Sequence, residues 1–550
     1  MPSFKLDGKE IPFQPGESII RAAYNQGIEI PHYCWHPGLS SPANCRMCLV
    51  EILPAANQRA VMLDILEWDA AAGDYRPTRK PKLQPSCQMQ AVDGQEIKAD
   101  SSTHVQEARK AVQESLLLNH PVDCPICDQA GECRLQDYWL EYQKTPKRMR
   151  DEPVHKPKAE IFGDTIVYDG ERCVMCTRCI RFMEEVAHDP VLGMRERGNL
   201  NEIFVAPGRK LEGHYTFMTE HVCPVGALTT KDFRFKARVW FLRTAKSVCQ
   251  GCATGCNAHL DFDARNNKVY RYRPRDNEAV NAYWMCDEGM LSYKRAHEDR
   301  LLEAKLSGRV AGQAAVLEAT RKLFDGVARE SIAVVLSAQH SLEDNWALLE
   351  LARTSLGTKN IYFSKDADGY EDKILIHKDK SSNTRGVREL APEAKPFEAL
   401  MVDVGAVRTT HVIALGSATP RAKSDEEGAA EDLGGLKGLR ALVTIATNTG
   451  PLSDAAHVIL PAASWAETSG TYVNAKGIKQ TSEKGIELLG SARPGWEQVA
   501  HVARALGYEP TWSKLKDIRA RLGLGPAGTG TRPAQANEPT GPTHVGTTAD

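Results

Sequence analysis

The chain has 550 residues, enough for several domains that each bury a core. Its net charge of −2 at pH 7 excludes the strong positive field expected of a nucleic-acid-binding protein or of a surface that attracts anionic lipid. Hydrophobic residues make up 42% of the chain and charged residues 25%, as in soluble globular proteins. We therefore expect no nucleic acid among its partners.

The N-terminal residues lack the basic region and apolar run of a secretory signal. No apolar stretch reaches the roughly 20 residues that a membrane helix needs, so no direct membrane span is expected. Since nothing exports the chain, its 15 cysteines are expected to be reduced and to bind metal rather than to form disulfides. The expected location is the cytoplasm, and peripheral attachment to a membrane complex remains open.

Residues 1–98 begin with a strand, a turn at Asp7-Gly8, a second strand and a helix from Ser18 to Asn25. Four cysteines follow, with one close pair and the last one after a long polar insertion: Cys34, Cys45, Cys48 and Cys87. Four thiolates with one close pair are what a [2Fe–2S] centre requires. A structural zinc site is the alternative, but zinc sites usually combine two short Cys-x-x-Cys pairs.

Residues 99–145 contain a helix followed by a second group of metal-binding side chains. Apolar residues recur at helical spacing from Val105 to Leu117. The helix leads into one imidazole and three thiols close together in the sequence: His120, Cys124, Cys127 and Cys133. One His with three Cys suits tetrahedral zinc as well as an iron–sulfur cluster, so these residues alone leave both open.

Two further cysteine groups follow. Residues 146–242 carry a Cys-x-x-Cys-x-x-Cys run and a distant Cys-Pro: Cys173, Cys176, Cys179 and Cys223. This pattern is typical of a [4Fe–4S] cluster, and such a run has no use in tetrahedral zinc chemistry. Residues 243–300 carry a different spacing with two short strands inside it: Cys249, Cys252, Cys256 and Cys286. The cysteines then divide without remainder into groups of four, three with His120, four and four, which favours iron–sulfur clusters over independent zinc sites.

Residues 301–522 contain no cysteine and have the pattern of an α/β domain. A buried strand at 331–336, a helix at 342–356 and a strand at 359–363 predict a βαβ unit. Later strands run into polar turns, as at the ligand-binding edge of an α/β sheet, but ordinary α/β loops look the same and no GxGxxG or P-loop motif is present. A structural role is therefore favoured. Residues 523–550, rich in Gly, Pro, Thr and Ala, are expected to be a disordered tail.

The ordered set of motifs resembles that of the large iron–sulfur subunit of respiratory complex I, which is the G subunit of NADH-quinone oxidoreductase. Besides the four groups above, the resemblance rests on three longer motifs: Glu171-Arg-Cys-Val-Met-Cys-Thr-Arg-Cys-Ile-Arg-Phe, His221-Val-Cys-Pro-Val-Gly-Ala-Leu and Cys286-Asp-Glu-Gly. The resemblance covers residues 1 to about 300 and implies a [4Fe–4S] cluster at the His120 group. The stretch from Asp454 to Asn474 resembles part of the molybdopterin oxidoreductase fold, which this family keeps without molybdenum.

The resemblance implies an α+β multidomain fold. In chain order we expect a β-grasp [2Fe–2S] ferredoxin-like domain, a helical His/Cys cluster segment, a [4Fe–4S] ferredoxin-like domain, a molybdopterin-oxidoreductase-type [4Fe–4S] domain and a truncated, degenerate molybdopterin-oxidoreductase-like α/β domain. The gap from Cys48 to Cys87 is longer than usual in the family, so Cys87 is the ligand least supported by the pattern. The C-terminal domain is shorter than in many members, and no molybdopterin is expected.

The function implied by the resemblance is electron transfer without a substrate site. Electrons would pass from an NADH-binding flavoprotein subunit to the [2Fe–2S] centre, then to the Cys173 and His120 clusters, and on to a two-cluster ferredoxin-like subunit that leads to quinone. The Cys249 cluster would be mainly structural. Such a subunit lies peripherally on the cytoplasmic side of the inner membrane. The alternatives are an electron-relay or molybdenum-type subunit of an NAD-linked hydrogenase or formate dehydrogenase, although no cysteine after Cys286 could bind molybdenum.

Overall fold

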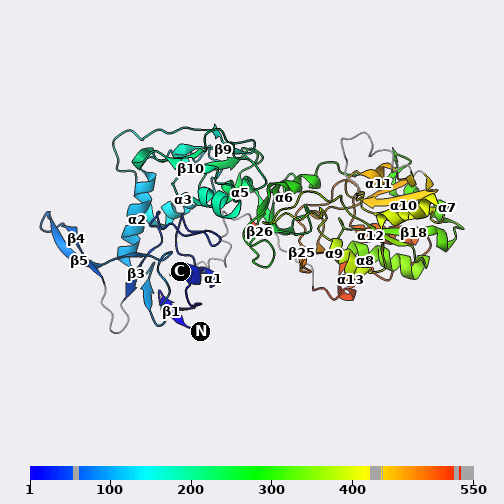
Figure 1. Ribbon diagram of the computed structural model, residues 1–550, viewed down its shortest axis with the longest axis horizontal. Helices are drawn as coiled ribbons and strands as arrows, with labels where there is room; N and C mark the ends of the chain where they lie inside the picture. Colours follow the sequence, from blue (N-terminus) through cyan, green and yellow to red (C-terminus); the bar gives the residue numbers. More distant parts are fainter. Residues whose placement is uncertain (54–60, 421–434, 437, 526–531, 534–550) are drawn as a thin grey trace. The chain divides into compact units, whose positions relative to one another are not determined.

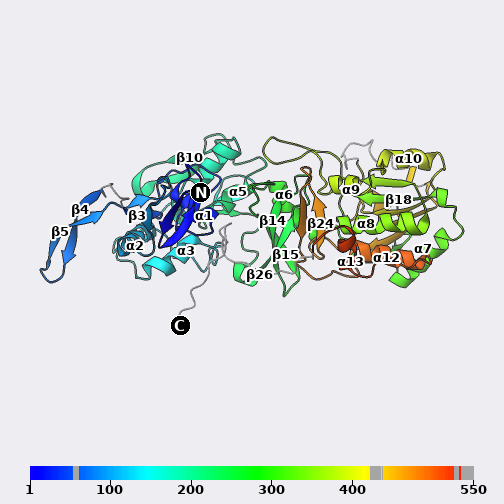
Figure 2. The same cartoon turned by 90° about the horizontal axis from the view of Figure 1, so that it is seen from below.

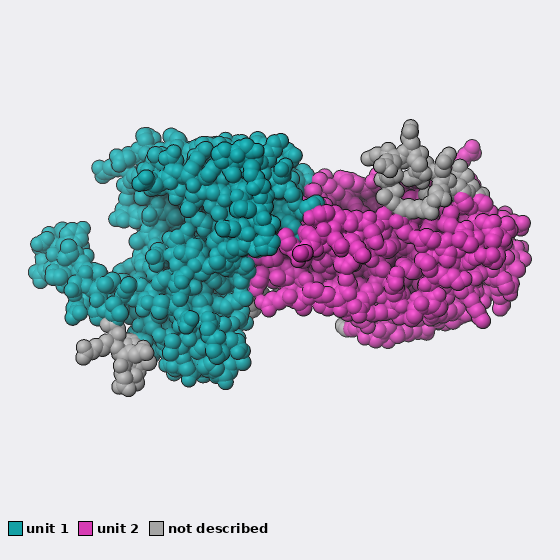
Figure 3. Space-filling model, in the orientation of Figure 1, with its two compact units in different colours: residues 1–239, 535–550 teal, residues 240–534 magenta. Residues whose placement is uncertain are grey.

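The computed structural model describes residues 1–53, 61–420, 435–436, 438–525 and 532–533. The chain divides into two compact units, coloured separately in Figure 3: residues 1–239 with 535–550, and residues 240–534. None of the helices in the described ranges has the length and apolar character that crossing a bilayer requires.

The first unit begins with a mixed five-stranded sheet in the order β2-β1-β7-β3-β6. Its strands are β1 (Ser3–Leu6), β2 (Lys9–Pro12), β3 (Leu49–Leu53), β6 (Gln84–Pro85) and β7 (Glu96–Lys98). The strands β1 and β2 form the expected hairpin, whose turn residues Asp7 and Gly8 both have positive φ. Helix α1 (Ile19–Asn25) begins at Ser18, whose hydroxyl accepts a hydrogen bond from the Arg21 backbone N–H. The apolar side of α1 joins the core of this β-grasp sheet.

The polar insertion before Cys87 contains a separate two-stranded sheet, formed by β4 (Met62–Asp69) and β5 (Asp74–Pro81) (Figure 1). Sequence reasoning missed this hairpin, because its strands bury little apolar surface and show no clear alternation. The side chains of Leu66, Trp68 and Tyr75 are 68%, 57% and 60% exposed.

The rest of the first unit is built from short elements around the cysteine loops. Its helices are α2 (Thr103–Leu117), α3 (Arg134–Tyr138), α4 (Arg178–Arg181) and α5 (Phe217–His221). The strands β8 (Glu160–Ile161), β9 (Ile166–Tyr168) and β12 (Leu228–Thr230) form an antiparallel sheet, and β10 (Leu192–Arg195) pairs with β11 (Glu202–Val205). The predicted helix from Val105 to Leu117 corresponds to α2.

The second unit begins with an antiparallel sheet in the order β15-β14-β13-β26, seen in Figure 2. Its strands are β13 (Arg243–Val248), β14 (Asn257–Asp263), β15 (Lys268–Pro274) and β26 (Arg532–Pro533), and α6 (Asp287–Leu291) follows β15. The two strands expected between Cys256 and Cys286 are β14 and β15. Strand β26 falls within the tail that we expected to be disordered, which corrects that expectation for these two residues; residues 526–531 and 534–550 lie outside the described part.

The remainder of the second unit is centred on an eight-stranded sheet in the order β17-β16-β23-β22-β21-β18-β19-β20. The strands from β23 to β20 run parallel. The strands are β16 (Lys305–Leu306), β17 (Arg309–Val310), β18 (Ile332–Ser337), β19 (Ile361–Ser364), β20 (Lys395–Pro396), β21 (His411–Leu415), β22 (Ala441–Ala446) and β23 (Val458–Pro461). The predicted βαβ unit is β18, α8 (Leu342–Glu350) and β19.

Helices cover both faces of this sheet. Alternate strand residues face opposite cores: Val334 and Ile413 join one, and Val335 and Val412 join the other. The first core includes α7 (Gln313–Phe324), α8, α12 (Gly495–Ala505) and α13 (Leu515–Arg521), and the second includes α10 (Phe397–Gly405) and α11 (Pro451–Asp454). Helix α9 (Thr384–Leu390) and the hairpin of β24 (Gly470–Val473) and β25 (Lys479–Ser482) complete the unit.

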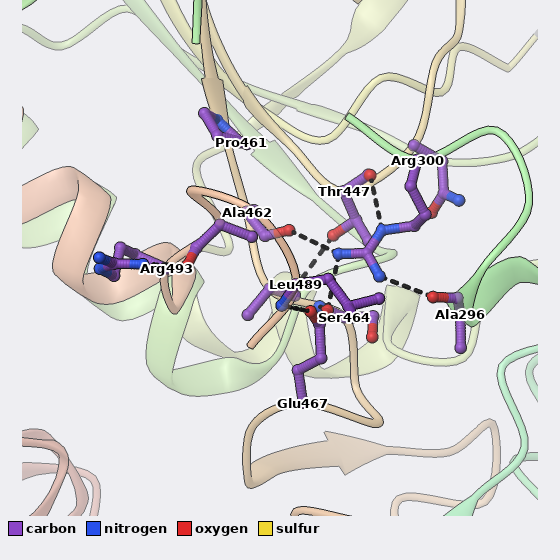
Figure 4. Close-up of polar contacts among 12 residues, drawn as sticks. Ala296, Arg300, Thr447, Pro461, Ala462, Ser464, Glu467, Leu489 and Arg493 are labelled. Atoms are coloured by element: carbon purple, nitrogen blue, oxygen red, sulfur yellow. Dashed lines mark hydrogen bonds and ion pairs between the residues drawn. The ribbon is translucent and has the colours of Figure 1, made fainter. Parts of the chain in front are cut away.

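A buried ion pair joins the segment after α6 to the ends of the sheet strands (Figure 4). The Nη2 atom of Arg300 lies 2.6 Å from Oε2 of Glu467, and both side chains are almost fully buried. The guanidinium also donates to the Ala296 and Thr447 carbonyls, and Glu467 Oε2 accepts from the Ser464 backbone N–H at 2.6 Å. This network fixes residue 300 against the loops that follow β22 and β23.

Candidate iron–sulfur sites

The first group of cysteines, named the Cys34 site, is gathered in the β-grasp part of the chain. Its members are Cys34, Cys45, Cys48 and Cys87. The thiol of Cys34 lies beside that of Cys45, and the thiol of Cys48 lies beside that of Cys87. The two thiols of each pair share a proton, which lowers the pKa of Cys45 to about 5 and that of Cys87 to about 7 and raises the pKa of Cys34 and of Cys48 well above its ordinary value. Cys45 and Cys87 are therefore the more acidic members of the site, and the thiolate is the form that binds iron.

The loop around Cys45 is shaped for donation to sulfur. Ala43 and Arg46, on either side of Cys45, adopt positive φ angles of 54° and 59°, a conformation found in loops whose N–H groups bind anions. The Tyr33 backbone N–H donates to Cys45 Sγ at 3.5 Å. Tyr33, which precedes Cys34, thus supplies a donor to this sulfur.

The long gap before Cys87 does not separate it from Cys48. Strands β3 and β6 pair, and the Ser86 hydroxyl donates to the Cys48 carbonyl at 2.8 Å. The β4–β5 hairpin takes up the intervening residues. The structure thus brings the residue that the pattern supported least into the same group as the other three.

The second group, the His120 site, lines a cavity of about 600 Å³. His120, Cys124, Cys127 and Cys133 all face this cavity, together with apolar side chains such as Leu117, Leu135 and Trp139. Burial lowers the pKa of His120 to about 4, so the imidazole is neutral at pH 7. Its Nδ1 is buried and has no hydrogen-bond partner among the described residues. A neutral imidazole and three thiols around a cavity of this size fit a [4Fe–4S] cluster.

The third group, the Cys173 site, consists of Cys173, Cys176, Cys179 and Cys223. Burial raises the pKa of Cys173 to about 11, with the neighbouring Cys176 thiol acting in the same direction. Met175 and Thr177 have positive φ, and the Met175 backbone N–H donates to Cys173 Sγ at 3.4 Å. A bound metal is what would hold such buried thiols as thiolates, because coordination removes their protons.

Gly226 connects the Cys173 site to the His120 site. It lies in the Cys223-Pro-Val-Gly loop, and a Cβ atom on Gly226 would lie 2.4 Å from Cys127 Sγ. In the same region, the Arg134 backbone N–H donates to the Pro224 carbonyl at 3.1 Å. Sequence reasoning quoted this glycine within a motif but gave it no role, because its neighbour is distant along the chain.

The fourth group, the Cys249 site, lies in the second unit and consists of Cys249, Cys252, Cys256 and Cys286. The Gly251 and Gly289 backbone N–H groups donate to Cys249 Sγ and Cys286 Sγ at 3.4 and 3.3 Å. A Cβ atom on Gly289 would lie 3.2 Å from both sulfurs, so a glycine lets the backbone approach them closely.

In the part of the chain that the structure describes, no three His, Cys, Asp or Glu side chains converge where a single metal ion would sit. A cluster distributes its ligands over several irons, so its ligands lie farther apart than those of a mononuclear site.

A small polar cavity of about 40 Å³ lies at the carboxyl ends of the parallel strands, where α/β domains bind ligands. Its lining includes His340 and Asp366, which follow β18 and β19, and Thr447, which follows β22. This volume holds only a few water molecules. The cavity does not fit a molybdopterin.

Family models match five stretches of the chain. In the first unit these are a 2Fe-2S iron-sulfur cluster binding domain over residues 2–67, the NADH-ubiquinone oxidoreductase-G iron-sulfur binding region over 109–148, and the ferredoxin-like domain of NADH-quinone oxidoreductase subunit 3 over 163–229. In the second unit they are the molybdopterin oxidoreductase Fe4S4 domain over 242–298 and molybdopterin oxidoreductase over 411–505. The 2–67 match ends before Cys87.

Curated proteins show the same relationship over most of the chain. The G subunit of NADH-quinone oxidoreductase from Streptomyces coelicolor is 33% identical over 364 residues, which are 65% of this chain and 40% of that protein. Its counterpart from Rickettsia felis is 34% identical over 365 residues, 66% of this chain and 50% of that protein. The chain is a relative of the G subunit of NADH-quinone oxidoreductase. The relationship extends to the mitochondrial NADH dehydrogenase [ubiquinone] iron-sulfur protein 1 of Solanum tuberosum, at 33% identity over 65% of this chain and 45% of that protein.

These matches confirm the expected α+β multidomain fold, with 2Fe-2S and 4Fe-4S binding domains followed by a molybdopterin-oxidoreductase-like domain. The chain spans about half the length of the curated relatives it matches, or less. Among solved structures, a chain of an NAD+-reducing [NiFe]-hydrogenase aligns with 26% identity and a TM-score of 0.34 over 43% of this chain and 91% of that chain. That score is too low to support a structural argument.

Proposed function

We propose that this chain is an electron-relay subunit of an NADH-quinone oxidoreductase and has no substrate site of its own. The observation that carries the proposal is that three of the four cysteine groups are contiguous within the first unit. The Cys34 site and the Cys173 site share contacts through α4, and the Cys173 site and the His120 site share contacts through Gly226. Such a row of sites suits stepwise electron transfer.

The proposed ligands are the sixteen side chains of the four sites. Cys34, Cys45, Cys48 and Cys87 would hold a [2Fe–2S] cluster, and the His120, Cys173 and Cys249 sites would each hold a [4Fe–4S] cluster. When bound, the clusters supply one-electron oxidation and reduction. Eleven of the fifteen cysteines are buried, whereas Cys124 is exposed. Backbone N–H groups donate to four of the ligand sulfurs, which lowers the cost of placing negative charge in the interior.

His120 distinguishes its site from the other three. A neutral imidazole in place of a thiolate removes one negative charge from the ligand set, and this makes reduction easier. The His120 ligand should therefore raise the reduction potential of its cluster relative to an all-cysteine set. We assign the Cys249 site, in the second unit, a mainly structural role.

The proposed partners are an NADH-binding flavoprotein subunit as electron donor and a two-cluster ferredoxin-like subunit as acceptor. The proposed location is the cytoplasmic side of the inner membrane, as a peripheral part of a membrane complex. Interfaces in permanent complexes of this kind bury more than roughly 2,000 Å² in total.

The test is to purify the intact chain anaerobically together with its neighbours, identify them by mass spectrometry and record EPR spectra at several potentials. The proposal predicts four reducible clusters, no molybdenum, and a flavoprotein and a ferredoxin-like chain among the neighbours. Molybdenum in the preparation would favour a formate-dehydrogenase-type subunit. A nickel-containing neighbour would favour the relay of an NAD-linked hydrogenase.

A further inference from the structure

Two arginines of α4 are buried between the Cys34 site and the Cys173 site. Arg178 and Arg181 are only 9% and 7% exposed. They flank Cys179 in the sequence and follow Cys176 closely, so the helix that carries them is part of the Cys173 site. An arginine keeps its positive charge in proteins, so this region contains two buried cations.

Both guanidinium groups bridge the loops that carry the cysteines of the two sites. Arg181 Nη2 donates to the Cys34 carbonyl at 2.5 Å and to the Cys176 carbonyl at 3.2 Å. Arg178 Nη2 donates to the carbonyl of Trp35, the residue after Cys34, at 2.5 Å. Arg178 Nη1 donates to the carbonyl of Val222, the residue before Cys223, at 3.2 Å. The two arginines thus tie the Cys34 loop to the cysteine run and to the Cys-Pro loop of the next site.

These two cations lack the carboxylate partner that the other buried arginines have. Five further arginines with buried side chains in the described part of the chain each form an ion pair: Arg109 with Asp100, Arg172 with Asp123, Arg271 with Asp261, Arg300 with Glu467, and Arg519 with Glu343. Within the described residues, no carboxylate oxygen lies within 4.0 Å of a guanidinium nitrogen of Arg178 or Arg181. The carboxylate of Glu185 acts on Arg181 electrostatically, but it lies more than 4.0 Å away and accepts hydrogen bonds from Ser40.

A buried charge without a counter-charge is strongly disfavoured, so the missing negative charge has to come from another source. The cysteine sulfurs of the two sites are candidates, because Cys176 and Cys34 act electrostatically on Arg181 and Cys176 acts on Arg178. A cluster with four thiolate ligands carries net negative charge. Clusters at the Cys34 and Cys173 sites would therefore balance the positive charges of the two arginines.

We propose that Arg178 and Arg181 are shared counter-ions of the clusters at the Cys34 and Cys173 sites. This inference rests on the proposed function, because it requires clusters at both sites. The arginines are positioning residues: their positive charge stabilises the reduced form of each cluster, because reduction adds one electron and so one negative charge. Arg181 also joins the two ligand sets by a continuous path, from the Cys34 carbonyl through the guanidinium to the Cys176 carbonyl.

The experiment uses the full chain in its assembled complex, titrated with dithionite and followed by EPR, for the variants Arg181→Gln and Arg178→Gln. Each substitution removes one positive charge and should shift the midpoint potentials of both clusters downward, with the iron and labile sulfide content unchanged. Arg109→Gln is the matched control, because Arg109 is equally buried but pairs with Asp100 and touches no cluster cysteine. It should leave both midpoints unchanged.

The variant Arg181→Lys separates charge from geometry, because lysine keeps the positive charge but lacks the planar fork that reaches two carbonyls. Its midpoints should stay close to those of the unmodified protein, while reduction of the Cys173 cluster by way of the [2Fe–2S] cluster becomes slower. Unchanged midpoints in both glutamine variants would overturn the inference. So would loss of both clusters in Arg181→Lys, since the retained charge should preserve them. Absence of clusters from the unmodified protein would instead overturn the proposed function.

Discussion

Replacing Gly226 by alanine should disrupt the His120 site and leave the Cys34 and Cys249 sites intact. The added Cβ would lie 2.4 Å from Cys127 Sγ, whereas ordinary contacts begin at 3.4 Å, so either the loop or the sulfur has to move by about 1 Å. Inserting a methyl group into a closely packed interior typically costs about 1–3 kcal/mol. Metal–sulfur bonds tolerate deviations of only about 0.2 Å, so a displacement of this size is incompatible with Cys127 as a ligand.

The assay is anaerobic iron analysis together with EPR of the fully reduced protein. Gly226→Ala should lose about four irons per chain and the signal of the His120 cluster, while the signals of the [2Fe–2S] and Cys249 clusters remain. Gly312→Ala is the matched control, because nothing lies within 4 Å of its Cβ position. A Gly226→Ala protein with full iron and an unchanged spectrum would refute the argument that Cys127 binds iron against this loop.

Three further outcomes are expected. His120→Cys should keep a cluster but lower its midpoint potential, because a thiolate adds negative charge; an unchanged midpoint in a redox titration would contradict the ligand role. Arg300→Met should cost about 3–5 kcal/mol of unfolding free energy, since it leaves the Glu467 carboxylate buried without its partner. The double variant Arg300→Met with Glu467→Gln should recover part of that free energy, as measured by urea unfolding. If it recovers none, the two side chains are not energetically coupled. Burial lowers the pKa of His32 from 6.5 to about 3, so between these values the unfolded chain binds a proton that the folded chain does not. Stability should therefore fall as the pH falls from 6.5 towards 3, and His32→Gln should flatten the fall in the urea midpoint between pH 7 and pH 5; an equal fall in both proteins would exclude His32 as its source.

Much of the architecture follows from local sequence signals. The Asp7-Gly8 pair predicted the first hairpin, and the periodicity from Val105 to Leu117 predicted α2. The short apolar runs that predicted β18 and β19 are buried on both faces of the sheet, where a continuous apolar sequence is expected. These features depend on residues that are close together in the chain.

The features that sequence reasoning missed depend on contacts between distant residues. The proximity of Gly226 to Cys127 comes from packing two loops about a hundred positions apart, and no local pattern shows it. The same holds for Arg181, which reaches Cys34 across 147 positions. The alternation of arginine and cysteine in the run Cys176-Thr-Arg-Cys-Ile-Arg181 was a usable signal, because a positive side chain among thiolate ligands suggests charge compensation. The interpretation of this run used only the spacing of its cysteines and so left the two arginines without a role.

Metal and sulfide analysis of the oxygen-protected protein is the direct test of the claim that the four groups of side chains bind iron–sulfur clusters. One [2Fe–2S] and three [4Fe–4S] clusters predict about fourteen irons and as many labile sulfides per chain, with a brown colour that bleaches on reduction. A colourless protein that contains zinc and no labile sulfide would contradict the claim.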